Sequence, residues 1–330
     1  MRHAPYPRGM DRREFLFRAA AAAPLLLGGR PASASASGQS ALALVTADTE
    51  AHVGIVSLAS GRIVGRLTTH DGPRSIERGR ARQVIVAHTV RGEISLLDGR
   101  PPRVRRVLGG FSQPRYTAMA PDGVHAYVTD SGHGEVATID LRAGRVVHRL
   151  AVGSLARHVT IDPAGRTLWI ALGSSANTIV VVDVSEPSRP RMKRRLAPAF
   201  LAHDVSLSPS GRRVWVTSGR TGKLMVYAAG GTRPVRVLDA DTAPQHVSFG
   251  GGVAYVASGE GRSLRVYDLR DGHIRHEASV PLGSYNVQRG AGRVLTPSLA
   301  SGRLTILDPQ GRVRHEVHVA AAAHDACALV

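Results

Sequence analysis

Large polar side chains recur along this chain just before short β-branched segments, at intervals of about 42 residues. When the segments are aligned on the apolar residue that follows, one position holds Arg74, Arg115, Arg157, His203, Gln245, Tyr285 and His324. We call these the first series. The second series is the next residue of each repeat: Ser75, Tyr116, His158, Asp204, His246, Asn286 and Asp325. Arginine and histidine side chains that converge bind carboxylate, phosphate or sulfate through charge-assisted hydrogen bonds, so the first series is the predicted ligand-binding site.

The same residue types keep an enzymatic alternative open. A lyase or a lactone hydrolase needs a general base and a group that stabilises a developing oxyanion. His203 or His324 could be the base, with Arg115 or Arg157 beside the oxyanion. The sequence contains no G-x-S-x-G nucleophile elbow, no P-loop and no dinucleotide-binding fingerprint. We therefore predict non-catalytic binding and assign no catalytic residues.

Four histidines raise a second alternative, a metal site. His203 and His324 belong to the first series, whereas His158 and His246 belong to the second. Because adjacent residues of a strand point to opposite sides, we expect only one of these pairs to face a common axis unless the strand bulges. Two histidines and a neighbouring aspartate could bind zinc or copper. The nearby arginines would repel a cation, so we predict no cofactor and keep a metal carrier as an alternative.

The segments that position these residues have the pattern of β-strands. They are short, rich in β-branched residues and bounded by Gly, Pro and Asp. The clearest repeat has a tight turn at Pro121-Asp122-Gly123, followed by strands at Tyr127–Thr129 and Val136–Asp140. A basic fourth strand follows in each repeat. Four strands in about 42 residues is the size of one blade of a β-propeller.

The repeats predict an all-β fold, a seven-bladed β-propeller. Its first strand segment, Ala41–Thr46, is of the second type in the repeat, and its final segment, Asp325–Leu329, is of the first type. We therefore expect the N- and C-terminal strands to share one blade and close the ring, which removes exposed sheet edges. The first strand of each propeller blade is innermost, so the first series should lie at one mouth of the central channel.

Two motifs carry a resemblance to a known family. Tyr127-Val128-Thr129 and Pro121-Asp122-Gly123 resemble the repeat of the YVTN-repeat β-propellers, also called YncE-like proteins. The resemblance covers residues 41–330 and implies the fold rather than an activity. It also implies a range of roles, because the family includes exported binding proteins, a nucleic-acid binder and a zinc carrier, and is similar in architecture to lactonase propellers.

Residues 1–36 have the features of an export signal. Arg12 and Arg13 precede an apolar run that ends near Leu27, and small residues follow at 32–36. The run is shorter than the roughly 20 residues that span a bilayer, and the small residues suit a signal peptidase. The paired arginines resemble a twin-arginine signal. We expect a single mature domain, residues 37–330, without a transmembrane segment, in the periplasm or outside the cell.

Composition narrows the partners. The chain is 43% hydrophobic and 21% charged, which is typical of a soluble globular protein, and its formal net charge is +18. A basic chain suits an anionic partner, but here the charge is spread along the sequence rather than clustered, which does not favour nucleic acid. The single cysteine, Cys327, predicts no disulfide. We expect a monomer that binds an anionic small molecule or an exported protein, with a polyanion or protein-interaction scaffold as the last alternative.

Overall fold

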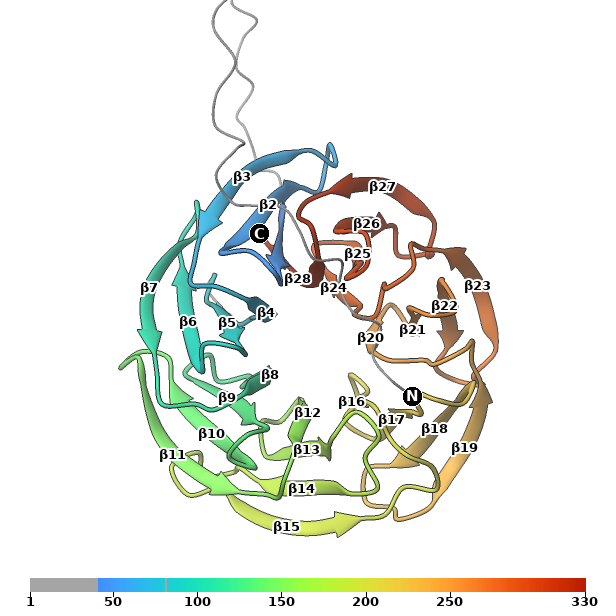
Figure 1. Ribbon diagram of the computed structural model, residues 1–330. Coiled ribbons are helices and arrows are strands. Elements are labelled where there is room, and N and C mark those ends of the chain that lie inside the picture. Colours follow the sequence, from blue (N-terminus) through green and yellow to red (C-terminus); the bar gives the residue numbers. More distant parts are fainter. Residues whose placement is uncertain (1–40, 81) are drawn as a thin grey trace, which may run out of the picture. The chain divides into compact units, whose positions relative to one another are not determined.

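Seven four-stranded antiparallel sheets, the blades, surround a central axis in the computed structural model, which describes residues 41–80 and 82–330 (Figure 1). Every regular element in these ranges is a strand, so the prediction of an all-β, seven-bladed propeller is confirmed. The predicted export signal, residues 1–36, lies outside the described residues. Within the described ranges no helix is long and apolar enough to cross a membrane.

Each blade runs from the axis outward. The innermost strands are β4 (Pro73–Arg78), β8 (Pro114–Met119), β12 (Ala156–Ile161), β16 (Val205–Leu207), β20 (Val247–Gly250), β24 (Gln288–Gly290) and β28 (Ala323–Leu329). The second strands are β1 (Leu42–Ala47), β5 (Val84–His88), β9 (His125–Asp130), β13 (Thr167–Leu172), β17 (Arg213–Thr217), β21 (Val253–Ser258) and β25 (Arg293–Pro297). The third strands are β2 (His52–Ser57), β6 (Glu93–Asp98), β10 (Glu135–Asp140), β14 (Ile179–Asp183), β18 (Lys223–Ala228), β22 (Ser263–Asp268) and β26 (Arg303–Leu307). The outer strands are β3 (Ile63–Thr68), β7 (Arg103–Leu108), β11 (Arg145–Ala151), β15 (Arg191–Leu196), β19 (Pro234–Asp239), β23 (Ile274–Ser279) and β27 (Val313–His318).

The ring closes as predicted, through a blade that both ends of the described chain share. β28 is the innermost strand of the blade that continues with β1, β2 and β3. It pairs antiparallel with β1, so that Leu42 lies opposite Leu329 and Leu44 lies opposite Cys327. Cys327 is a buried free thiol inside this pairing.

The middle strands form the hydrophobic core between blades. All six residues of β21 are buried, since neighbouring blades cover both faces of the sheet. Aromatic side chains fill the wedge between two blades, where the Trp215 ring lies 5.9 Å from the rings of both Phe249 and Tyr267. Outer-strand arginines cover this core from outside: the guanidinium of Arg194 lies 5.2 Å from the Trp169 ring. Part of the basic charge therefore serves packing.

The innermost strands begin irregularly. The pairing of β12 with β13 shifts register between Ala156 and Val159, and the pairing of β8 with β9 shifts between Pro114 and Thr117. Such shifts break the strict alternation of side chains along a strand. The side chains at the start of these strands are the ones that reach the channel.

Candidate functional site

A cavity of about 220 Å³ occupies the central channel. All seven members of the second series line it: Ser75, Tyr116, His158, Asp204, His246, Asn286 and Asp325. A further row follows two residues along the innermost strands and includes Glu77, Thr160, Ser206, Ser248 and Gln288. The first series, on which the binding prediction rests, is absent from this lining among the described residues. Its members sit one position earlier in each repeat.

The three arginines of the first series lie close to one another. The guanidinium of Arg157 is 5.9 Å from the ring centre of Tyr116, which places it next to the cavity lining. Arg74 donates to the Asp48 carboxylate at 2.7 Å. Burial, together with the positive charges of Arg157 and Arg74, lowers the pKa of Arg115 to about 10. The structure therefore brings these three predicted residues together as one cationic group.

Gln245 and Tyr285, also of the first series, are not part of this cationic group. The Tyr285 ring packs against Gly259 so closely that a Cβ on this glycine would lie 2.2 Å from the ring. Gln245 is half-buried, and its backbone amide donates to the carbonyl of Ala257. Tyr285 thus fills space against the neighbouring blade.

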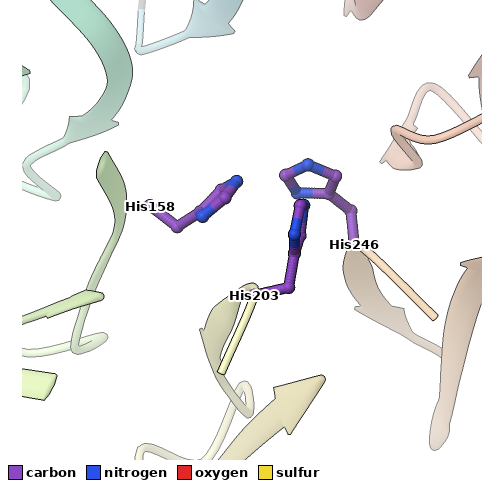
Figure 2. Close-up of side chains that lie close together, drawn as sticks. All are labelled: His158, His203 and His246. Atoms are coloured by element: carbon purple, nitrogen blue, oxygen red, sulfur yellow. The ribbon is translucent and has the colours of Figure 1, made fainter. Parts of the chain in front are cut away.

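Three histidines converge in the channel: His158, His203 and His246 (Figure 2). One ring nitrogen of each lies within 4.8 Å of the others, and the side chains are 1%, 8% and 8% exposed. The expectation that only one series could face the axis is therefore wrong. His203, from the first series, precedes β16 and is not in a strand, so the alternation of side chains does not apply to it.

Contacts on the Nδ1 side hold two of these rings, and in one of them, His203, the other nitrogen keeps no partner within the described ranges. Nδ1 of His203 lies 3.0 Å from the carbonyl oxygen of Ser174, and since a carbonyl only accepts, Nδ1 donates and Nε2 keeps its lone pair. Nδ1 of His246 lies 3.5 Å from the Asp204 carboxylate, and its Nε2 lies 3.3 Å from the Tyr116 hydroxyl. A carboxylate or carbonyl behind an imidazole is the arrangement that orients a histidine toward a metal.

His158 has no such partner. Neither Nδ1 nor Nε2 of this buried ring has a hydrogen-bond partner within residues 41–80 and 82–330. Its ring centre lies 4.5 Å from that of His203 and 4.4 Å from that of Tyr116. A buried imidazole without partners is costly, which makes a ligand in this position expected.

The ionisation of the site favours neutral imidazoles beside one carboxylate. Burial, with the charges of other histidines and of Arg157, lowers the pKa of His158 and of His203 below the ordinary value. Burial alone would raise the pKa of Asp204, but His246 and a hydrogen bond from Ser206 hold it below its usual range. Neutral imidazole is the form that binds a metal ion.

The fourth candidate histidine, His324, belongs to a different network. Its Nδ1 lies 3.0 Å from the carbonyl oxygen of Arg74, and its own carbonyl accepts from Asn286 at 2.8 Å. The neighbouring Asp325 accepts hydrogen bonds from the backbone amide of Ile76 at 3.0 Å and from Gln288 at 3.2 Å. These contacts join β28 to β4 and to β24.

Sequence reasoning missed Glu77. This residue lies two positions after Ser75 in β4, and burial, with the charge of Asp325, raises its pKa to about 8. The period-2 alternation from the second series would have found it.

A second group with metal-ligand chemistry lies outside the channel. Asp130, His133 and Glu135 come together near the turn between β9 and β10. The Asp130 carboxylate already accepts backbone amides of Ser112 and Gln113, each at 2.7 Å. This group stabilises a turn.

Comparisons with known proteins identify the fold. No protein-family model matches the sequence, and no curated protein matches it. A functionally unknown protein from Desulfotomaculum acetoxidans DSM 771 superposes with a TM-score of 0.75 at 13% identity, covering 87% of this chain and 98% of that one. Apo AztD from Citrobacter koseri gives 0.65 at 11% identity, covering 88% and 97%, and Kuenenia stuttgartiensis hydrazine synthase gives 0.63 at 16%, covering 77% and 88%. At these identities the likeness shows a shared β-propeller fold alone.

Proposed function

We propose that this propeller binds a zinc or copper ion in its central channel through His158, His203 and His246. The observation that carries the proposal is His158, a buried imidazole whose two nitrogens have no hydrogen-bond partner in the described part of the chain. Imidazole nitrogens suit both metals, and three of them are a sufficient protein ligand set when a fourth position is left open.

The neighbours of the three rings support the same function. Ser174 and Asp204 lie on the Nδ1 side of His203 and His246, which leaves Nε2 of His203 available and requires Nε2 of His246 to exchange the Tyr116 hydroxyl for the metal. Because three histidines converge among the described residues, the ion would keep one coordination position open. An open position lets the ion exchange ligands, which suits reversible carriage.

The cellular setting is part of the proposal. Arg12 and Arg13 ahead of an apolar run support export by the twin-arginine route, to the periplasm or beyond the cell. The Tyr127-Val128-Thr129 repeat and the seven blades support membership of the YVTN-repeat class. We propose a monomeric, exported metal-binding propeller.

A second candidate function, binding of a small anion, is favoured by the arginines of the first series. The Nε atoms of Arg74, Arg115 and Arg157 are buried and lack hydrogen-bond partners within the described ranges. Guanidinium groups in this state can donate charge-assisted hydrogen bonds to a carboxylate, phosphate or sulfate. A thermal-shift panel of these anions tests the idea, because stabilisation should disappear in the Arg115→Gln/Arg157→Gln protein.

The experiment for the metal site uses tag-free mature protein, since an affinity tag of histidines would itself bind metal. Calorimetric titration with Zn²⁺ and with Cu²⁺ should give one ion per chain for at least one of them, and elemental analysis after gel filtration should retain it. His158→Ala should lose this binding. His318→Ala removes an exposed histidine of β27 and serves as the matched control. Wild-type protein that binds no more metal than His158→Ala would contradict the proposal.

A further inference from the structure

The two candidate sites share a boundary, and from this we infer a single composite site. We propose that the metal ion binds together with a small carboxylate, which occupies the open coordination position of the metal and pairs with Arg115 and Arg157. The inference rests on the proposed metal site and names the class of its second ligand.

Tyr116 is the side chain that joins the arginines to the histidines. The Arg157 guanidinium lies 5.9 Å from its ring centre, and the ring centres of His158 and His246 lie 4.4 Å and 5.3 Å from it on the channel side. The ring centre of His203 in turn lies 4.5 Å from that of His158. The Arg157 guanidinium and the three imidazoles therefore form one continuous cluster around Tyr116.

Two arginines at this boundary have no carboxylate partner within the described ranges. Arg74 is paired with Asp48, and the Asp204 carboxylate contacts His246 and Ser206 rather than Arg115 or Arg157. For Arg115 the only side-chain acceptor within the described ranges is the amide oxygen of Gln113, at 3.3 Å.

Arg157 is equally short of a counter-charge. Its side chain has no hydrogen-bond acceptor among residues 41–80 and 82–330, and its guanidinium lies over the Tyr116 ring. A divalent ion on the histidines would add two positive charges to an already cationic, partly buried region. An anion that accompanies the ion removes this repulsion.

A carboxylate meets both requirements with its two oxygens. One oxygen can take the position that three histidines leave open on a tetrahedral ion. The other can accept charge-assisted hydrogen bonds from the unpaired guanidinium groups. A metal without this anion would have to bind against Arg115 and Arg157, and an anion without the metal would lose one of its two attachments.

The test compares Zn²⁺ affinity at constant pH and ionic strength in potassium perchlorate, whose anion coordinates metals weakly, and in potassium acetate. Free zinc is corrected for its weak complex with acetate. Wild-type protein should bind zinc about tenfold more tightly in acetate, the size of an ordinary coupling between two ligands. In Arg115→Gln/Arg157→Gln this dependence should vanish. In perchlorate the same variant should bind zinc at least as tightly as wild type, because a repulsion has been removed.

The control variant is Arg142→Gln/Arg145→Gln, which removes the same charge from exposed positions around β11. It should behave as wild type in both salts. Co²⁺ in place of zinc adds a spectroscopic reading, since its visible absorption should change when acetate enters the coordination shell of wild type and should not change in Arg115→Gln/Arg157→Gln.

The outcomes separate the two proposals. Equal zinc affinity in both salts, with an unchanged Co²⁺ spectrum, overturns the composite site and leaves the three-histidine site standing. Failure to bind Zn²⁺, Co²⁺ or Cu²⁺ in either salt overturns both proposals. Acetate dependence that persists in Arg115→Gln/Arg157→Gln also overturns the composite site, because the anion then acts without the arginines.

Discussion

The two walls of the central channel use similar residues in opposite ways. On the wall made by β28, β4 and β24, Asp325, Gln288 and Asn286 hydrogen-bond to neighbouring strands. On the wall made by β12, β20 and the segment before β16, the ring of His158 is unpartnered within the described ranges, and His203 keeps one nitrogen free. The first wall fastens blades together, whereas the second presents unused ligand atoms.

The difference shows that residue type alone does not identify a site. His203-Asp204 and His324-Asp325 occupy equivalent positions in two repeats. Both carboxylates accept a backbone amide of the next blade, Asp325 from Ile76 at 3.0 Å and Asp204 from Val247 at 3.4 Å, but Asp204 also stands behind the imidazole of His246. The side chain that the next blade presents, rather than the place of the carboxylate in the repeat, decides whether the carboxylate also orients a histidine.

The largest expected effect on metal binding comes from the wall that contains His158. His158→Ala should weaken zinc binding by at least about 100-fold, since it removes one of three direct ligands. Its free energy of unfolding without metal should stay the same or rise, because a buried group without partners has been removed. Calorimetric titration and chemical denaturation measure the two effects. A large loss of stability in the metal-free protein would show that His158 stabilises the fold, as Asp325 does, rather than serving as a metal ligand.

On the wall made by β28, β4 and β24, a substitution should reduce stability and leave zinc binding nearly unchanged. Asp325→Ala should lower the free energy of unfolding by about 2–3 kcal/mol, because the buried amide of Ile76 loses its acceptor. Zinc affinity should change by less than about threefold. Denaturation and titration of one preparation check both numbers. A strong loss of zinc binding would show that the two walls are not independent.

A smaller, pH-dependent effect is expected at Glu77, which faces the same channel. Its pKa is raised to about 8 in the folded protein, so the native state holds a proton that the unfolded state releases near its ordinary pKa. Stability contributed by this group therefore falls as pH rises from about 4.5 to about 8. Because Glu77 is only partly buried and lines the channel cavity, we expect Glu77→Gln to gain only about 1–2 kcal/mol at pH 8.

At pH 4.5 the same variant should match wild type, since glutamine resembles the protonated acid. Denaturation at both pH values checks the prediction. An equal difference at the two pH values would mean that the substitution acts through packing rather than through ionisation.

The smallest effect is expected at Tyr116. Its hydroxyl lies 3.3 Å from Nε2 of His246, the nitrogen that the metal would need. Tyr116→Phe should leave zinc affinity unchanged or improve it by up to about threefold, since a competing hydrogen bond of ordinary strength is lost. Titration of the variant decides this, and a tenfold loss would make Tyr116 a ligand itself.

The repeat allowed most of the fold to be predicted. Strand type, blade number and the pairing of the first and last strands follow from alternation, turn residues and the phase of the repeat. The two series of channel positions also follow from that phase. The meeting of His203 with His158 could not be predicted, because it depends on an irregular backbone ahead of β16 and a register shift in β12.

The packing of Tyr285 against Gly259 was equally hidden, since no pattern in one blade reports the free space in the next. Hydrogen bonding was the other unpredictable element. Whether a histidine nitrogen is free depends on carbonyls such as that of Ser174, 29 residues away in the sequence.

The pairing of β28 with β1 also sets an order of events during synthesis. Until the last strand has left the ribosome, β1 presents an inner edge with unpaired amides and carbonyls, while the other six blades can already be complete. β28 also carries Asp325, whose carboxylate accepts a hydrogen bond from Ile76 in β4 of the next blade. A nascent or truncated chain that lacks β28 thus exposes the inner edge of β1, which can pair with other chains. Pairing of β28 with β1 removes this edge and closes the ring in one step.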